Sequence, residues 1–340
     1  MVTSVVTGGS GFVGRHLVKA LLARGDLVKV VDVGLAPDIC SNSHKAKFIK
    51  TDITDKQALA EAFKDADCVF HVASVVHTKQ NQTEFIWKVN HGGTINVIDV
   101  CKEKKIPKLI YISSGSVVYE GQDIENGTES LPYSSISQAP YADSKIEAER
   151  AVLAASDDRL ATVALRPHVI FGPEDTRFLP ALLKNAKKGK LRFKIGLGKW
   201  LSDFTYIDNL IDACLAAEER LQVGSKVSGQ AYFITNGEPM GFFEFVQSFL
   251  SLAQLPPMLT AIPHQPILAL AYINEWFDTY IRGGTLTAED GFTPFAIKYL
   301  CTHHYFSIEK ARKDLEYVPK VSIQEGIRLS VDYLKDKGNL

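Results

Sequence analysis

The chain has 340 residues, a formal net charge of −1, 46% hydrophobic residues and 23% charged residues. This length supports a substantial core in one large domain or two closely joined ones, and the composition is ordinary for a soluble globular protein. The near-zero net charge gives no electrostatic basis for binding nucleic acid, and no apolar run reaches the roughly 20 residues that span a bilayer.

The cysteines are widely spaced and form no C-x-x-C pair. They predict neither a zinc site nor a disulfide framework, so we expect no metal ligands. Their odd number, with no secretory leader before the first predicted strand, favours a reducing compartment and hence a cytoplasmic location. The five residues are Cys40, Cys68, Cys101, Cys214 and Cys301.

The first half of the chain alternates between short apolar runs and segments with helical spacing. Strands are predicted at residues 2–7, 27–33, 47–50, 68–72, 109–113 and 160–166. Helices are predicted at residues 12–23, 56–63, 85–101 and 141–153. Strands that alternate with helices over short loops predict a Rossmann-type doubly wound parallel sheet, the α/β class.

After about residue 170 the pattern is less regular. Helices are predicted near residues 178–188, 207–221, 241–253 and 322–335, with one further strand at 230–235. The segment 255–305 has no clear period, and its apolar run 266–277 predicts a packed or surface-lying helix. We therefore expect a Rossmann domain at 1–170, to which parts of 200–235 return, and a smaller C-terminal cap formed mainly by 171–340.

A glycine-rich turn lies between the first predicted strand and the first predicted helix. Gly8, Gly11 and Gly14 fit G-x-x-G-x-x-G, while Gly9, Gly11 and Gly14 fit G-x-G-x-x-G. Such a turn is tight, lets the backbone approach a pyrophosphate, and places it at a helix N-terminus that offers free N–H groups. The position of the turn, directly after a strand, is the context that a dinucleotide-binding motif requires.

Acidic residues follow the second and third predicted strands. Asp32 ends the second strand, where a carboxylate accepts hydrogen bonds from both ribose hydroxyls and repels a 2′-phosphate. No arginine follows closely to hold such a phosphate, so NAD is favoured over NADP. Asp52 and Ile53 are candidates for an adenine contact, with an ordinary turn or helix-capping carboxylate as the alternative for Asp52.

Tyr141 and Lys145 are spaced i and i+4, so they face the same side of a predicted helix. Interconversion of an alcohol and a ketone needs a proton acceptor near neutral pH, whereas free tyrosine titrates near 10. A neighbouring ammonium lowers that value, so Lys145 is placed to activate Tyr141. A hydroxyl at the end of the preceding strand is expected to align the substrate oxygen; Ser114 is favoured, with Ser113 and Ser116 as alternates.

These residues together resemble the extended short-chain dehydrogenases, and within them the 3β-hydroxysteroid dehydrogenases, above all the sterol-4α-carboxylate 3-dehydrogenases (decarboxylating). The resemblance covers nearly the whole chain. It rests on the cofactor loop, Asp32, the Tyr141 and Lys145 pair, and on longer segments in both halves. Those segments are residues 71–74, 90–96, 113–117, 123–132, 166–173, 196–206, 233–239 and 292–294.

The resemblance implies oxidation of a sterol or steroid 3β-hydroxyl with NAD, with loss of CO2 where a 4α-carboxylate is present. It also implies a homodimer, and a peripheral contact with the endoplasmic reticulum membrane on its cytosolic face if the source is eukaryotic. His168 and Arg177 are candidates to contact the carboxylate, with structural roles as the alternative. The implied cofactor contacts are Gly8, Gly11, Phe12, Val13, Gly14, Asp32, Asp52, Ile53, Ala73, Ser74, Ser113, Tyr141, Lys145, Pro167 and Val169.

Nucleotide-sugar epimerases and dehydratases share the cofactor half and form the main alternative. They usually carry an asparagine where this chain has Val169, and an arginine that binds substrate phosphates where it has Ser202. A phosphate-rich substrate needs charge-assisted donors, so both departures favour an apolar substrate. A non-catalytic NAD-binding redox sensor is a second alternative, although such proteins typically lack the Tyr or the Lys.

Overall fold

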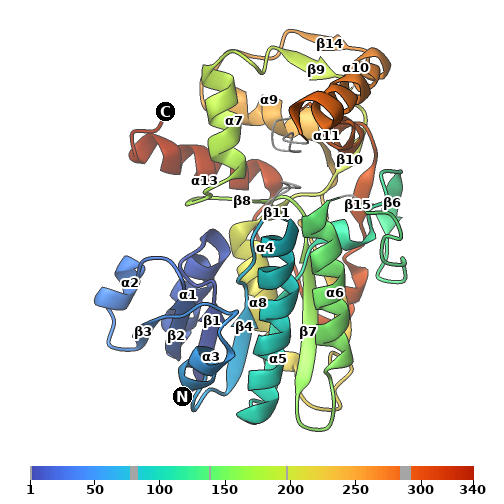
Figure 1. The fold of residues 1–340 in the computed structure, drawn as a ribbon. Coiled ribbons are helices and arrows are strands. Elements are labelled where there is room, and N and C mark those ends of the chain that lie inside the picture. The colour runs from blue at the N-terminus through green and yellow to red at the C-terminus, as the bar shows by residue number, and fades with distance from the viewer. Residues whose placement is uncertain (1, 77–82, 138, 197, 284–291) are drawn as a thin grey trace.

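The computed structural model describes residues 2–76, 83–137, 139–196, 198–283 and 292–340. Its centre is a parallel sheet of seven strands in the order β12-β7-β5-β4-β1-β2-β3 (Figure 1). The strands are β1 (Thr3–Thr7), β2 (Leu27–Asp32), β3 (Ala46–Lys50), β4 (Cys68–His71), β5 (Lys108–Ile112), β7 (Ala161–Pro167) and β12 (Gln230–Ile234). The strand order reverses between β1 and β4, which is where folds of this kind bind ligands.

Helices cover both faces of this sheet because its strands are apolar on both sides. One face packs on α1 (Phe12–Arg24), α8 (Ile207–Arg220) and α12 (Glu309–Leu315). The other face packs on α3 (Lys56–Ala62), α5 (Gly93–Glu103) and α6 (Pro140–Ala154). The short helices α2 (Asp38–Ser41) and α4 (Thr83–Trp87) complete this part of the chain. All predicted strands of the sheet and the doubly wound fold are confirmed.

The second part of the molecule stands beyond the carboxyl ends of the strands (Figure 1). Its helices are α7 (Phe178–Lys187), α9 (Phe242–Leu252), α10 (His264–Phe277), α11 (Pro294–Leu300) and α13 (Ile323–Asp336). Its short strands are β6 (Ile124–Gly127), β8 (Ile170–Phe171), β9 (Phe193–Ile195), β10 (Leu201–Ser202), β11 (Thr205–Tyr206), β13 (Met240–Gly241), β14 (Thr260–Ile262) and β15 (His304–Phe306). They form small sheets, of which the largest has the order β13-β10-β15-β6.

Two segments carry structure that the sequence analysis did not specify. The predicted continuous helix at 85–101 is interrupted by a π-helical turn, Lys88–Gly92, between α4 and α5. The segment 255–305, predicted to have no clear period, contains β14, α10 and α11; residues 284–291 lie outside the described part. Helix α10 was predicted from its apolar run and shows no helical period, because it buries only Ala271 and leaves apolar side chains such as Ile273 and Trp276 exposed.

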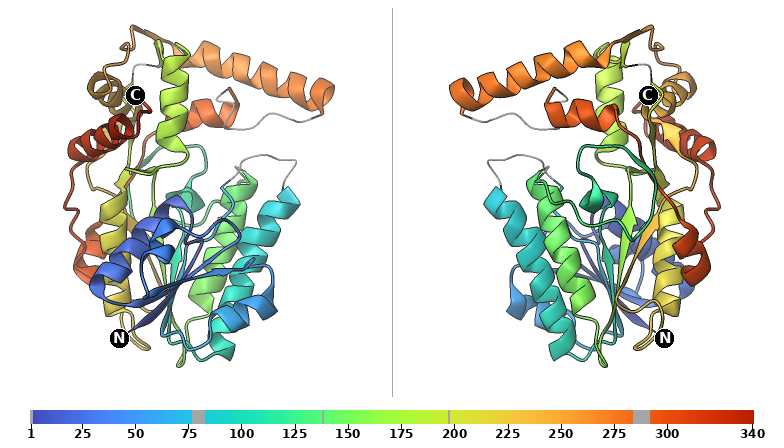
Figure 2. Two further views of the ribbon diagram at one scale, coloured as in Figure 1. Left: turned by 90° about the vertical axis from the view of Figure 1, so that its left-hand side faces the viewer. Right: turned by 90° about the vertical axis from the view of Figure 1, so that its right-hand side faces the viewer.

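Helix α10 extends away from the body of the cap (Figure 2). The apolar run 266–277 thus forms a surface-lying helix, one of the two expected arrangements. Within the described residues, no helix is both long enough and apolar enough to cross a bilayer.

Candidate active site

A cavity of about 590 Å³ opens beside the carboxyl ends of β1, β2, β4, β5 and β7. Of the cofactor contacts and favoured catalytic residues predicted from the sequence, only Lys145 does not line it; Arg177, a candidate for the substrate carboxylate, lines it, whereas His168 and the alternate serine Ser116 do not. The predicted residues that line it are Gly8, Gly11, Phe12, Val13, Gly14, Asp32, Asp52, Ile53, Ala73, Ser74, Ser113, Ser114, Tyr141, Pro167 and Val169. The sequence therefore identified the site as a whole, while the role of each residue stays a prediction.

The glycine loop is packed too closely for other side chains. A Cβ on Gly14 would lie 2.1 Å from the Gly8 carbonyl oxygen, and a Cβ on Gly8 would lie 2.7 Å from the Ala73 backbone. Gly8 also has a φ of +69°, a backbone conformation that residues other than glycine rarely adopt. At the start of α1, Gly11 provides no side-chain cap for the first backbone N–H groups of the helix, and residues 11–14 line the cavity.

Asp32 stands at the end of β2 and is hydrogen-bonded to the same loop. Its Oδ2 accepts from the Ser10 backbone N–H at 3.0 Å, and its Oδ1 accepts from the Gly34 N–H at 2.8 Å. The carboxylate thus links the glycine loop to the strand end while lining the cavity. An acid fixed there has remaining lone pairs for ribose hydroxyls and repels a 2′-phosphate.

Tyr141, near the start of α6, lines the cavity together with Ser114. Burial raises the pKa of Tyr141, while the hydrogen bond from Ser114 and the charge of Arg177 oppose that rise. Ser114 also lies 2.8 Å from Ser116, Oγ to Oγ. The Ser113 hydroxyl is buried and has no hydrogen-bond partner among the described residues. The geometry therefore favours Ser114 as the hydroxyl that works with Tyr141.

Lys145 is buried one turn further along α6. Its Nζ donates to the Ile112 carbonyl at 2.6 Å and lies 4.3 Å from the centre of the Tyr111 ring. Burial lowers the pKa of Lys145 to about 7, against a smaller opposing effect of Glu149. The groups that lower the pKa of Tyr141 are thus Ser114 and Arg177, and activation by Lys145 remains a prediction.

Asn90, for which no specific role was predicted, lies in the π-helical turn and is buried. Its Oδ1 accepts from the Val75 N–H at 2.7 Å, and its Nδ2 donates to the Val75 carbonyl and to the Ser144 hydroxyl, each at 3.0 Å. It therefore links the cavity wall after β4 to α6, directly before Lys145. A π-helical turn is often found at functional sites, but no feature of the sequence marked this one.

The contacts of His168 support a structural role, one of the two alternatives expected for it. Its Nδ1 lies 2.8 Å from the Asp203 carbonyl oxygen, which only accepts, so Nδ1 carries the proton. Its Nε2 then accepts from the Tyr299 hydroxyl at 2.8 Å. Burial lowers the pKa of His168 to about 4, so the ring is neutral near pH 7. One ring nitrogen is thus bonded to the Asp203 carbonyl and the other to Tyr299 of α11, so neither is left for a substrate carboxylate.

Ser202 is buried, and its hydroxyl lies 2.9 Å from Nε2 of His304. It is therefore part of the cap interior and does not line the cavity. Val169, which does line it, has a φ of +38°. A β-branched residue in that conformation is strained, and such strain is concentrated at functional sites.

These features fit a dinucleotide and an alcohol together. The glycine loop closes against a helix N-terminus, an acid stands at the ribose position, and a tyrosine with a serine partner stands near the end of β5. The fold and the site define a dinucleotide-dependent oxidoreductase of the extended short-chain dehydrogenase class.

The model of the 3-beta hydroxysteroid dehydrogenase/isomerase family matches residues 5–258, and the chain belongs to this family. It is 39% identical over 328 residues to a Homo sapiens sterol-4-alpha-carboxylate 3-dehydrogenase, decarboxylating, covering 96% of this chain and 86% of the relative. It is 38% identical over 326 residues to a 2-alkyl-3-oxoalkanoate reductase of Stenotrophomonas maltophilia, covering 95% and 97%.

Among solved structures, a UDP-glucose 4-epimerase from Thermotoga maritima matches with a TM-score of 0.77 and 20% sequence identity, over 99% of each chain. Identity this low shows a shared fold alone. The family assignment confirms the resemblance stated from the sequence, and the similarity to an epimerase reflects the common architecture.

Proposed function

We propose that this protein oxidises the 3β-hydroxyl of a sterol that carries a carboxylate on the neighbouring carbon, with NAD as the oxidant, and that CO2 is then lost. The observation that carries the proposal is that Tyr141 and Ser114 line the same cavity as the glycine loop and Asp32. Similarity to sterol-4-alpha-carboxylate 3-dehydrogenases supports the substrate class.

In the proposed reaction the Tyr141 phenolate accepts the proton of the substrate hydroxyl, and Ser114 holds the same oxygen by a hydrogen bond. NAD, when bound along the glycine loop and Asp32, supplies the acceptor for the hydride. The product is a β-keto acid. Its bond to the carboxylate breaks to give CO2, and the electron pair moves to the ketone oxygen as an enolate that solvent protonates. The hydroxyls of Tyr141 and Ser114 stabilise this oxyanion.

A second candidate follows from the bacterial relative. By its name, a 2-alkyl-3-oxoalkanoate reductase acts on an open-chain β-keto acid, and the match covers 97% of its length. The same two hydroxyls then donate to the ketone, and Tyr141 supplies the proton in the reverse direction. Both candidates share a carboxylate next to the reacting carbon, and they differ in the apolar part of the substrate and the direction of the reaction.

The deciding experiment follows NADH formation by purified protein with NAD and three kinds of alcohol: 4α-carboxysterols, 2-alkyl-3-hydroxyalkanoates and UDP-sugars. Turnover of carboxysterols with CO2 release is expected. Turnover of only the hydroxyalkanoates moves the function to the second candidate. Turnover of UDP-sugars alone, or tight NAD binding with no turnover of any alcohol, contradicts both candidates and favours the epimerase or the sensor.

The quaternary state and membrane contact belong to the same proposal. A homodimer through α6 and the helical segment 85–101, and a peripheral contact of α10 with membrane lipid, fit a sterol substrate. The exposed apolar side chains of α10 support the second point. Sedimentation of the purified protein, alone and with phospholipid vesicles, tests the dimer and the membrane contact. A monomer that does not sediment with the vesicles contradicts both.

A further inference from the structure

The segment between β8 and α7 brings one guanidinium to the reacting end of the cavity. Arg177 lines the cavity together with Ser114 and Tyr141. Its charge also acts on the Tyr141 hydroxyl, whose pKa it lowers. Of the described residues that line the cavity, Arg177 is the only one with a basic side chain.

This segment is held firmly at both of its ends. The side chain of Asp175 accepts the backbone N–H groups of Arg177 at 2.8 Å and Leu179 at 2.8 Å, which fixes the start of α7. The carboxylate of Glu174 forms ion pairs with Arg15 and Lys19 of α1. The backbone that carries Arg177 is therefore fixed to the helix that follows the glycine loop.

The cavity acids that were predicted to contact the cofactor lie apart from the strand that carries Ser114. Asp32 and Asp52 follow β2 and β3, and the sheet order puts β2 three strands away from β5, about 14 Å at the usual strand spacing. Asp175, two residues before Arg177, is nearer, and the charge of Arg177 opposes the rise in the pKa of Asp175 that burial causes. Arg177 lines the same cavity as Ser114 and Tyr141.

We propose that Arg177 binds the carboxylate of the substrate and thereby selects β-hydroxy and β-keto acids over plain alcohols and ketones. The inference rests on the proposed function, in which the hydroxyl and the carboxylate stand on neighbouring carbons. A group that binds the carboxylate must then share the cavity with Tyr141, and Arg177 lines that cavity and acts on Tyr141 through its charge. Arginine suits this task because its planar guanidinium matches a carboxylate with two parallel hydrogen bonds.

The test compares the wild-type protein with Arg177→Met and Arg177→Lys on two substrates, a 4α-carboxy-3β-hydroxysterol and the same sterol without the carboxylate. Arg159→Met is the matched control, because that side chain is 82% exposed and its ion pair is with Asp158. Three quantities are measured: kcat/KM for each substrate, the dissociation constant of each sterol from the NADH-loaded protein, and the dissociation constant of NAD.

Arg177→Met is expected to lower kcat/KM for the carboxysterol about ten- to hundredfold, the usual effect of losing a hydrogen-bonded charge. The plain sterol and NAD binding should change less than about threefold, and Arg177→Lys should recover part of the loss. Arg159→Met should change nothing. Equal losses on both sterols, or a matching loss of NAD affinity, would overturn the role of Arg177.

Failure of the proposed function gives a different result. If no carboxylated alcohol is oxidised but Arg177→Met still weakens binding of the carboxysterol alone, the reaction is wrong and the role of Arg177 stands. If the wild-type protein neither oxidises the carboxysterol nor binds it more tightly than the plain sterol, both are overturned. If oxidation is seen and binding is insensitive to Arg177, only the present inference is overturned.

Discussion

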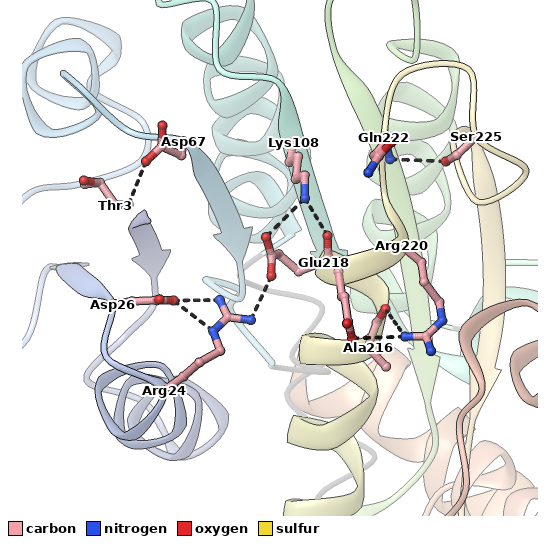
Figure 3. Close-up of polar contacts among 11 residues, drawn as sticks. Thr3, Arg24, Asp26, Asp67, Lys108, Ala216, Glu218, Arg220, Gln222 and Ser225 are labelled. Atoms are coloured by element: carbon pink, nitrogen blue, oxygen red, sulfur yellow. Dashed lines mark hydrogen bonds and ion pairs between the residues drawn. The ribbon is translucent and has the colours of Figure 1, made fainter. Parts of the chain in front are cut away.

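Charged side chains at one end of the central sheet form ion pairs, whereas ionisable side chains at the other end are buried beside neutral groups. At the amino ends of the strands, Glu218 of α8 accepts from Arg24 at 2.8 Å and from Lys108 at 3.2 Å, and Arg24 also binds Asp26 at 2.6 Å (Figure 3). At the carboxyl ends, Lys145 is buried against a backbone carbonyl, and Tyr141 is buried beside Ser114.

The pKa values record this difference. Although burial opposes it, hydrogen bonds to Asp26 and Glu218 raise the pKa of Arg24, so the charged form is stabilised where it lies. At the other end, burial lowers the pKa of Lys145 and raises that of Tyr141, so the charged form of each is disfavoured. The lowered pKa of Lys145, about 7, lets this group exchange a proton near neutral pH, whereas the raised pKa of Tyr141 means that this hydroxyl needs a neighbouring group to act as a base.

The largest expected effect comes from Tyr141→Phe, which keeps the ring and removes only the hydroxyl. Loss of a group that transfers a proton should lower kcat about 10²- to 10⁴-fold. NAD affinity and the melting temperature should stay close to those of the wild-type protein. Tyr280→Phe, at an exposed position, serves as the control. Turnover within a few-fold of wild type would remove Tyr141 from the mechanism.

Lys145→Met should separate activity from stability. We expect kcat to fall roughly 10²-fold, while the protein without cofactor becomes more stable at pH 7 by about 1–2 kcal/mol because a disfavoured buried ammonium is gone. The pKa of Lys145 is lowered to about 7 in the folded state from a usual value near 10.5, so the unfolded chain binds more protons between these values.

The pH dependence of stability checks the same point. Wild-type stability should contain a component that rises with pH from about 7 to 10.5, and Lys145→Met should lack it. Urea unfolding at several pH values measures both. Identical pH profiles for the two proteins would show that Lys145 is not held with a lowered pKa.

Asp32→Ala should change the choice of cofactor. Removing the carboxylate deletes hydrogen bonds to the ribose and the repulsion of a 2′-phosphate, so the ratio of kcat/KM for NAD to that for NADP should fall about 10- to 100-fold. Asp32→Asn, which keeps an acceptor for the Ser10 N–H, distinguishes this effect from loosening of the glycine loop. An unchanged ratio in both variants would contradict the assigned role.

In contrast to Lys145→Met, Glu218→Gln should lower the stability of the protein and have little effect on catalysis. The neutral amide leaves Arg24 and Lys108 with weaker partners, although Asp26 and the Glu218 carbonyl oxygen still accept from them. Because these side chains are partly exposed, we expect the free energy of unfolding to fall by only about 2 kcal/mol. The melting temperature measures this change, and a large drop in kcat would mean that the two ends of the sheet are coupled.

The sheet and its cofactor loop could be predicted because local patterns determine them. Apolar runs define the buried strands, and the spacing of Gly8, Gly11 and Gly14 reflects contacts within one turn. The cap could not be predicted in the same way. Strands β8, β10 and β11 have two residues each, too few to show a period, and their pairing depends on distant parts of the chain.

Within the site, distance along the chain separated what could be predicted from what could not. The Tyr141 and Lys145 pair follows from helical spacing. The choice among the three serines depends on the 3₁₀ turn Gly115–Val118, which orients Ser114 in space. The placement of Arg177 depends on ion pairs between Glu174 and α1, over 150 residues apart. Such contacts are formed only in the folded chain.

The crowding within the glycine loop restricts how this protein can diversify. Even one methyl group on Gly14 would collide with the Gly8 carbonyl oxygen, so the loop has almost no neutral substitutions. At the end of β2, Asp32 is partly exposed and the next residues, Val33 and Gly34, are exposed; a Cβ on Gly34 would meet side-chain atoms only. Changes of coenzyme specificity, in evolution or by engineering, are therefore expected at residues 32–34, whereas the glycine loop is expected to stay the same.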